Sequence, residues 1–192
     1  MATKALIFDN FGVLMDLVYS SLRRILPVEA RARLLDILDR ADNGQISDAE
    51  ELRQIEALLN EYNLDGAGSV ARAIQNADRN TELLDFIKAN RGKYKMAMLS
   101  NVSAVIWNYY TQEQLDEYFD VVVLSYQEGI AKPDPRIYEL TCRRLGVQPD
   151  ECIFTDDNEN NVIAARQLGM RGIVFTGNDD YFAKLKEMTN DA

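Results

Sequence analysis

The segment KALIFDNFGVLMD, residues 4–16, sets an apolar run directly before a carboxylate. All residues from Ala5 to Phe8 are apolar, which is typical of a short strand buried on both faces of a parallel sheet. Asp9 follows at once, although burying an unpaired charge beside a core is costly. The rest of the chain must therefore explain why a charged group stands at the end of this strand.

The remainder of the chain alternates short apolar runs with segments of helical periodicity. The runs predicted as further strands are residues 94–99, 121–124, 152–154 and 172–175. The segments predicted as helices between and after these strands are residues 104–110, 135–145, 161–168 and 179–188. Short apolar strands that alternate with helices indicate a parallel sheet covered on both faces.

Residues 17–88 differ, because apolar residues recur there at helical spacing and no strand-like run interrupts them. This helical segment directly follows the first predicted strand. We therefore predict an α/β fold, with a doubly wound, Rossmann-like parallel-sheet core and a small all-helical cap inserted after the first strand. The predicted boundaries are 1–15 together with 85–192 for the core, and 16–84 for the cap.

Polar residues follow four of the predicted strands. They are Asp9 to Gly12, Ser100 with Asn101, residues 125–132 ending at Lys132, and Asp156 with Asp157. In open parallel sheets ligands bind outside the carboxyl ends of the strands, so these residues should converge on one crevice. The inserted cap is in a position to cover the same edge of the sheet.

Charge and composition exclude several functions. A net charge of −10 and a sequence pI near 4.6 argue against a nucleic-acid partner. The chain has no histidine, which removes a Ser-His-Asp triad, a histidine-ligated zinc site and a histidine general base. No apolar run approaches the roughly 18 residues that a membrane helix needs, and we find no signal peptide. We expect a cytoplasmic protein with no membrane partner, in which Cys142 and Cys152 are buried free thiols.

Carboxylates dominate the predicted crevice, where those of Asp9, Asp156 and Asp157 meet. Like charges so close together raise at least one pKa strongly unless something compensates them. Mg²⁺, which takes oxygen ligands, and the fixed charge of Lys132 would supply that compensation. The hydroxyl of Ser100 and backbone N–H groups around Gly12 could bind an oxyanion. This combination suits phosphoryl transfer to a carboxylate.

Four motifs in this order resemble those of the haloacid dehalogenase-like (HAD) superfamily of hydrolases. They are FDNFGVL at 8–14, MLSN at 98–101, AKPDPRIY at 131–138 and FTDDNENNVIAARQLGM at 154–170. Order and spacing agree along the whole chain, and the last two motifs are nearly intact. The insert between the first two motifs resembles the helical cap of the family's phosphatase-like branch.

The resemblance implies a role for each matching residue. Asp9 matches the nucleophile that forms an aspartyl-phosphate intermediate and also ligates Mg²⁺. The backbone carbonyl of Phe11 matches a second metal ligand, and Lys132 matches the lysine that orients the nucleophile and balances its charge. Gly12 lies in the same motif, where backbone N–H groups would contact the phosphate.

The second and fourth motifs imply the remaining roles. Ser100 matches the hydroxyl that binds the transferring phosphoryl group, and Asn101 supplies a backbone N–H or an amide beside it. Asp156 and Asp157 match the acidic pair that holds the metal. We expect Asp157 to be a direct ligand and Asp156 to bind directly or through water.

Phe11 departs from the family pattern. Most phosphatases of the family carry a second Asp there, which protonates the leaving alkoxide and then deprotonates the attacking water. Phe11 can do neither, and general acid–base catalysis is typically worth roughly 10²–10⁴-fold. Asp16 could stand in for it, although we predict Asp16 as the N-cap of a first cap helix that starts at Leu17.

We expect a Mg²⁺-dependent phosphatase of a small phosphorylated metabolite, such as a sugar phosphate, acting as a monomer or homodimer. One alternative is a degenerate HAD-fold protein with weak or no catalysis that binds a ligand or partner. Another is a 2-haloacid dehalogenase, because dehalogenating members carry an aromatic residue at the place of Phe11. Those members work without metal, so the acidic pair Asp156 and Asp157 counts against that alternative.

The segment DRADNGQISDAE, residues 39–50, nearly matches a calcium-binding loop. Ala41 occupies a ligand position, however, and no second copy exists. We predict instead a turn at Asn43 and Gly44, followed by a capping box of Ser47 and Glu50 that starts the next helix.

Overall fold

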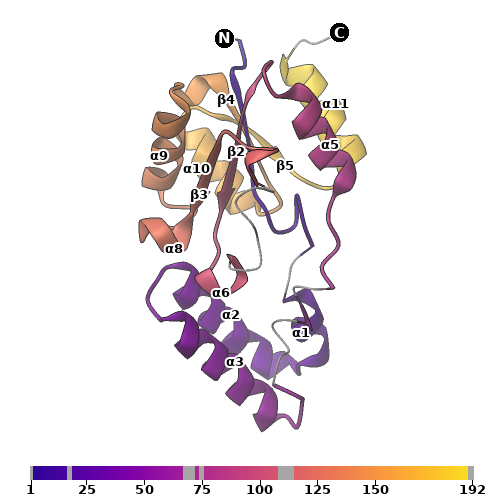
Figure 1. Cartoon of the computed structure of the whole chain (residues 1–192), viewed down its shortest axis with the longest axis vertical. Helices are drawn as coiled ribbons and strands as arrows, with labels where there is room; N and C mark the ends of the chain where they lie inside the picture. Colours follow the sequence, from indigo (N-terminus) through magenta and orange to yellow (C-terminus); the bar gives the residue numbers. More distant parts are fainter. Residues whose placement is uncertain (1, 17–18, 67–71, 74–75, 108–114, 190–192) are drawn as a thin grey trace.

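The computed structural model describes residues 2–16, 19–66, 72–73, 76–107 and 115–189 (Figure 1). Five strands form one sheet: β1 (Ala5–Phe8), β2 (Lys95–Ser100), β3 (Val121–Leu124), β4 (Cys152–Asp156) and β5 (Arg171–Val174). Their order across the sheet is β3-β2-β1-β4-β5, and every neighbouring pair is parallel. The predicted strands differ from these bounds by at most two residues, and the predicted α/β fold is confirmed.

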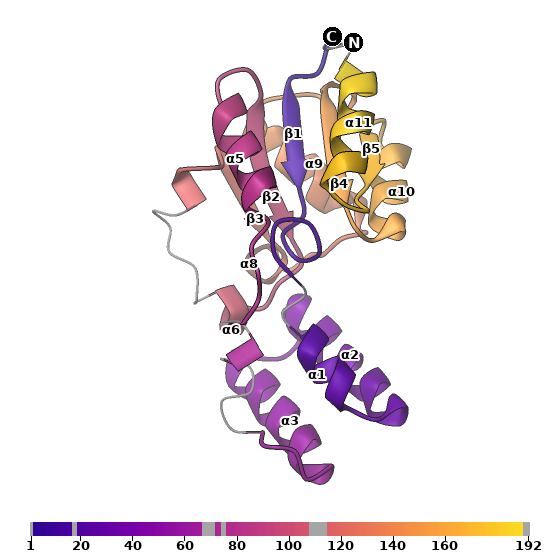
Figure 2. The same cartoon turned by 90° about the vertical axis from the view of Figure 1, so that its right-hand side faces the viewer.

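Helices cover both faces of the sheet. On one face lie α5 (Thr81–Asn90) and α11 (Asn178–Thr189), and on the other lie α9 (Pro135–Leu145) and α10 (Glu159–Gln167) (Figures 1 and 2). Side chains alternate between these layers. Phe8 belongs to the apolar cluster that contains Tyr181 of α11, whereas Ile7 belongs to the cluster that contains Tyr138 of α9. This two-sided burial explains why β1 is apolar throughout.

Shorter elements complete the core. They are α6 (Ala104–Trp107), α8 (Ser125–Glu128) and a 3₁₀ turn (Pro149–Glu151). The helix predicted over 104–110 begins as α6, and residues 108–110 lie outside the described residues. Cys142 and Cys152 are free and buried as predicted, with their Sγ atoms 3.7 Å apart. None of the described helices combines the length and the apolar character needed to cross a bilayer.

The cap consists of α1 (Ser20–Ile25), α2 (Val28–Asp42) and α3 (Asp48–Glu61), and it lies beyond the carboxyl ends of the strands (Figures 1 and 2). Leu34 of α2 and Ile55 of α3 are fully buried between the cap helices. The same apolar cluster includes Val102 and Leu124 from the core. The cap therefore packs directly on the edge of the sheet where ligands are expected.

The segment 39–50 forms a turn between α2 and α3. Gly44 has a φ of +66°, and its N–H donates to the carbonyl oxygen of Ala41 at 2.9 Å. Ser47 Oγ accepts the N–H of Glu50 at 3.3 Å, so Ser47 is the N-cap of α3 as predicted. The carboxylate of Glu50 binds Arg53 instead of the cap backbone. The turn and the cap are confirmed, and the second half of the capping box is not formed.

The start of α1 corrects one prediction. This helix begins at Ser20 with Tyr19 at the N-cap position, so the prediction that Asp16 caps it is wrong. The backbone N–H of Asp16 instead donates to the carbonyl oxygen of Asp78 at 2.9 Å. Asp16 belongs to a connection that pairs with the chain returning from the cap, and the predicted helix start at Leu17 lies outside the described residues.

The two connections between cap and core run side by side. Besides the bond at Asp16, the N–H of Asn80 donates to the carbonyl oxygen of Leu14 at 2.9 Å. Asn80 is also the N-cap of α5, which buries Leu83 and Ile87 against the sheet. The boundaries 1–15 with 85–192, and 16–84, stay a prediction.

Candidate active site

The register of β1 and β4 brings two carboxylates to the same level of the sheet. Phe8 pairs with Thr155, and the N–H of Asp9 donates to the carbonyl oxygen of Thr155 at 2.8 Å. Asp9 and Asp156 therefore reach the carboxyl edge side by side. The chain proceeds from β1 to β2 on one side and later places β4 on the other, which is the switch point where such sheets bind ligands.

Lys132 bridges these two carboxylates. Its Nζ lies 2.7 Å from Asp9 Oδ1 and 2.7 Å from Asp156 Oδ2, and its side chain is 1% exposed. Burial opposes the charge, but the attraction of Asp9 and Asp156 outweighs burial and raises the pKa of Lys132. The lysine is thus held as a buried cation between two acids, and its role in orienting a nucleophile stays a prediction.

Asp9 is held in one orientation through a single oxygen. Its Oδ1 accepts the N–H of Asn10 at 2.7 Å as well as the ammonium group of Lys132. Burial raises the pKa of Asp9, Lys132 offsets part of this rise, and the repulsion of Asp156 adds to it. The resulting pKa is about 7. Among the described residues, nothing donates a hydrogen bond to Oδ2 of Asp9, which leaves that oxygen for a ligand.

The first turn of α10 holds Asp156. The N–H of Asn158 donates to its Oδ1 at 2.8 Å, and Nδ2 of Asn161 donates to Oδ1 at 3.2 Å and Oδ2 at 3.0 Å. Asn158 is also the N-cap of α10, which turns the chain so that Asn161 lies over the carboxylate. Sequence reasoning did not select Asn161. The sequence does contain a signal for Asn161, because this residue stands one helical turn after the acidic pair in the fourth motif.

Asp157 completes a cluster with Asp9 and Asp156, in which one oxygen from each carboxylate lies within 4.8 Å of the others. Burial and the charge of Asp156 raise the pKa of Asp157. Gly12 packs against Asp157: its φ is +88°, and a Cβ there would lie 2.4 Å from Asp157 Oδ2. The N–H of Gly12 donates to the carbonyl oxygen of Met15 at 2.6 Å, so its predicted contact with phosphate stays a prediction.

Ser100 and Asn101 lie at the end of β2. Ser100 is fully buried, its Oγ donates to the carbonyl oxygen of Asn101 at 3.4 Å, and it does not line the cavity described below. Asn101 does line the cavity. Its Nδ2 donates to the carbonyl oxygen of Lys132 at 2.9 Å, and its Oδ1 accepts the N–H of Lys132 at 2.8 Å. Asn101 thereby fixes the loop that carries Lys132, and the phosphate-binding roles of both residues stay predictions.

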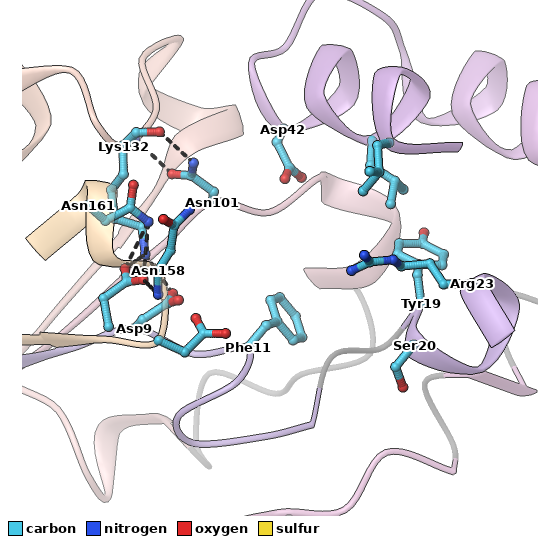
Figure 3. Close-up of a pocket in the computed structure, with 14 residues that line it drawn as sticks. Asp9, Phe11, Tyr19, Ser20, Arg23, Asp42, Asn101, Lys132, Asn158 and Asn161 are labelled. Atoms are coloured by element: carbon cyan, nitrogen blue, oxygen red, sulfur yellow. Dashed lines mark hydrogen bonds and ion pairs between the residues drawn. The ribbon is translucent and has the colours of Figure 1, made fainter. Parts of the chain in front are cut away.

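A cavity of about 500 Å³ separates the carboxylate cluster from the cap (Figure 3). Its core side is lined by Asp9, Phe11, Asn101, Lys132, Asp156, Asp157, Asn158 and Asn161, and its cap side by Tyr19, Ser20, Arg23, Leu35, Leu38 and Asp42. The ring of Phe11 projects from the β1 loop toward the cap (Figure 3). Asp16 is exposed and is not among the residues that line this cavity.

Sequence reasoning missed the charged groups that the cap contributes, Arg23 of α1 and Asp42 of α2. One signal could have identified Asp42. It is the last residue of a cap helix, immediately before the predicted Asn43–Gly44 turn, at an end of the cap that must face the core. No comparable signal marks Arg23, because its place depends on how α1 packs.

The donor set fits Mg²⁺. All three clustered side chains offer carboxylate oxygens, which are the ligands that this cation prefers. The three carboxylates also outnumber the single ammonium group of Lys132, which contacts two of them. A divalent cation held by Asp9, Asp156 and Asp157 would supply the missing positive charge. The backbone carbonyl of Phe11 stays a predicted ligand.

A capped α/β fold with an acidic cluster and a buried lysine at its switch point defines a class of enzyme that works by carboxylate chemistry. The family model of the haloacid dehalogenase-like hydrolases matches residues 3–169 of this sequence. The chain therefore belongs to the haloacid dehalogenase-like hydrolase family.

Two of the relatives that match most of the chain are named for different activities. The chain is 27% identical over 190 residues to the phosphorylated carbohydrates phosphatase of Thermotoga maritima, covering 92% of this chain and 88% of that protein. It is 27% identical over 215 residues to (S)-2-haloacid dehalogenase 4A of Burkholderia cepacia, covering 97% of this chain and 90% of that protein. A solved HAD family enzyme of Bacteroides thetaiotaomicron, in complex with magnesium and inorganic phosphate, aligns with a TM-score of 0.74 and 26% identity over 93% of this chain and 97% of its own.

Proposed function

We propose that the protein is a Mg²⁺-dependent phosphatase of a small phosphorylated metabolite, such as a sugar phosphate. The observation that carries the proposal is the cluster of Asp9, Asp156 and Asp157 around Lys132, at the floor of a cavity large enough for such a substrate. The relative from Thermotoga that acts on phosphorylated carbohydrates, and the solved relative that binds magnesium and phosphate, support it.

Asp9 is the nucleophile in this proposal. Lys132 and the N–H of Asn10 hold Oδ1, so Oδ2 attacks the phosphorus atom. The bond from phosphorus to the substrate oxygen breaks as the bond to Asp9 forms, and the leaving oxygen takes up a proton. Water then attacks the aspartyl-phosphate, which releases inorganic phosphate and restores the carboxylate.

The surrounding residues position this nucleophile and balance its charge. Lys132 stays cationic between Asp9 and Asp156, and Asn161 fixes both oxygens of Asp156. Mg²⁺, when bound, would supply Lewis-acid charge to the phosphoryl oxygens and favour the ionised form of Asp9. Fixed charges aimed at a transferring phosphoryl group stabilise its transition state without reorganisation during the reaction.

The acidic pair Asp156 and Asp157 also argues against dehalogenation. Dehalogenating relatives resemble this chain by the aromatic residue at Phe11, but they work without metal. Three carboxylates gathered within 4.8 Å are hard to explain in a metal-free site, because two of them would repel the charge of the nucleophile. Asp156 and Asp157 therefore favour the phosphatase over the dehalogenase.

Hydrolysis of p-nitrophenyl phosphate with and without Mg²⁺, by the wild type and by Asp9→Asn, tests the proposal. This substrate has a good leaving group, so Phe11 should limit its turnover least. We expect Mg²⁺-dependent turnover that disappears in Asp9→Asn, because an amide is a poor nucleophile. Chloride release from a 2-haloacid, assayed in parallel, should stay at background.

Two results would overturn the proposal. Chloride release without metal would indicate a dehalogenase. Bound Mg²⁺ with no turnover above that of Asp9→Asn would indicate a degenerate protein that binds a ligand or partner. The variant Asp180→Asn serves as the control, because Asp180 is a half-buried acid of α11 that pairs with Lys184 and does not line the cavity.

A further inference from the structure

The proposed reaction lacks a proton donor on the core side of the cavity. A leaving alkoxide needs a proton, and Phe11 has none to give. Asp9, Asp156 and Asp157 form the acidic cluster, and Lys132 donates to two of its members. The side chains nearest the phosphoryl group are therefore committed to charge balance.

The cap side of the cavity offers few alternatives. Its described lining contains four groups with an exchangeable proton, Tyr19, Ser20, Arg23 and Asp42, and the hydroxyl of serine is too weak an acid for this role. The hydroxyl of Tyr19 donates to Glu51 Oε1 at 3.0 Å, and an arginine does not lose its proton in a protein. Asp42 remains, and its carboxyl group projects from the end of α2 into the cavity, opposite the cluster around Asp9 (Figure 3).

The surroundings of Asp42 favour a protonated carboxyl group. Burial, then the charges of Glu51 on α3 and Asp39 on α2, raise its pKa to about 8, and Asp9 adds to the rise while Lys132 opposes it. The negative end of the α2 dipole acts in the same direction, because Asp42 is the last residue of that helix. Arg23 of α1 is the other charged group on the cap side of the cavity and is exposed.

We propose that Asp42, supplied by the cap, is the general acid and base of this enzyme and takes the role that Phe11 cannot perform. The proposal rests on the phosphatase function proposed above. A substrate with its phosphoryl group at Asp9 directs its leaving group past Phe11 toward α2, and Asp42 protonates the leaving oxygen as the P–O bond breaks. The resulting carboxylate then takes a proton from the water that attacks the aspartyl-phosphate. This restores protonated Asp42 and releases inorganic phosphate from Asp9.

The test compares the wild type with Asp42→Asn on a series of aryl phosphates, from p-nitrophenyl phosphate to phenyl phosphate. A p-nitrophenolate leaves without a proton, whereas phenolate is a poorer leaving group. We expect Asp42→Asn to keep kcat/KM for p-nitrophenyl phosphate within about threefold and to lose about 10²-fold for phenyl phosphate. Asp42→Ala, which leaves no amide in place of the acid, should give the same pattern.

The pH profile provides the second measurement. The acid must be protonated, so wild-type kcat/KM for phenyl phosphate should fall as the pH rises through the pKa of Asp42. That alkaline limb should disappear in Asp42→Asn. The matched control is Asp36→Asn, an exposed acid of the same helix that pairs with Arg40 and does not line the cavity. Its leaving-group dependence and pH profile should match those of the wild type.

The possible outcomes separate this inference from the proposed function. Equal losses on every aryl phosphate, or none, would overturn the role of Asp42 while leaving the phosphatase intact. A wild type that hydrolyses no aryl phosphate with Mg²⁺ bound would overturn both. Thermal melting curves of both Asp42 variants show whether a uniform loss comes from unfolding.

Discussion

At the scale of single residues, the site depends on close packing around Asp157. Asp157 is exposed. Asp156, by contrast, is fully buried and accepts hydrogen bonds from Lys132, Asn158 and Asn161. Gly12 supplies part of the missing restraint, because its α-carbon approaches Asp157 more closely than any side chain would allow. The first motif thus shapes the proposed metal site through a residue with no functional group.

Replacing this glycine tests that role. In Gly12→Ala the new Cβ would meet Asp157 Oδ2 at 2.4 Å, at a φ of +88° that alanine rarely adopts, so the carboxylate must move. Changes to groups that orient metal ligands typically cost roughly 10–100-fold in metal affinity or activity. We expect the Mg²⁺ concentration that half-activates p-nitrophenyl phosphate hydrolysis to rise by about that factor.

Gly92→Ala is the matched control. Gly92 has a φ of +90°, but a Cβ there meets nothing within 4 Å. Gly92→Ala therefore places alanine in a similarly unfavourable backbone conformation, but without a steric clash. An unchanged Mg²⁺ requirement in Gly12→Ala, or an equal change in Gly92→Ala, would refute the role given to Gly12.

At the scale of elements, the strands were easier to predict than the helix starts. A strand buried on both faces must be apolar throughout, so a run such as residues 5–8 can be recognised from the sequence alone. A helix start depends on which backbone groups find other partners. Asp16 has the side chain of an N-cap, but its backbone pairs with Asp78, a residue far along the chain that local sequence cannot indicate. At Ser47 no such competition occurs, and the local signal was sufficient.

The cap of α3 gives a prediction at this scale. Ser47→Ala removes the oxygen that accepts the N–H of Glu50 and should lower the free energy of unfolding by about 1 kcal/mol. For a chain of this size that corresponds to a fall of about 2–4 °C in melting temperature. Ser47 does not line the cavity, so p-nitrophenyl phosphate turnover should stay within twofold or so.

Ser47→Asp is the companion variant, because aspartate caps helices about as well as serine. It should melt within about a degree of the wild type. If both variants melt alike, the hydrogen bond of Ser47 does not stabilise α3 and the interpretation of this N-cap fails.

At the scale of the whole molecule, the chemistry is divided between two units. The core supplies the proposed nucleophile, the acidic cluster and the lysine. All of these lie at the end of a strand or in the segment after it, so they could be predicted from the sequence. The cap supplies Arg23 and Asp42, whose place at the cavity depends on how α1 and α2 pack on the core. No motif records that packing, which explains why the sequence indicates the proposed nucleophile and does not indicate the candidate acid.

Packing also explains why the sequence did not predict the contacts of two core residues, Ser100 and Asn101. Ser100 was predicted to follow a strand, but it is the last residue of β2 and is fully buried, and its Oγ donates to the carbonyl oxygen of Asn101. The amide of Asn101 fixes the loop of Lys132, while its predicted place beside the phosphate stays a prediction. Motif spacing locates residues at the edge of the sheet, whereas the direction of each side chain depends on the partners that it finds there.

Trapping of the covalent intermediate tests the central claim most directly. The wild-type protein, turning over p-nitrophenyl phosphate with Mg²⁺, would be quenched in acid and digested, and the peptide that contains Asp9 would be weighed by mass spectrometry. We predict the added mass of one phosphoryl group on Asp9, absent without Mg²⁺ and absent in Asp9→Asn. An unmodified Asp9 peptide from rapidly quenched, actively turning-over enzyme, or a phosphoryl group on another residue, would contradict the account.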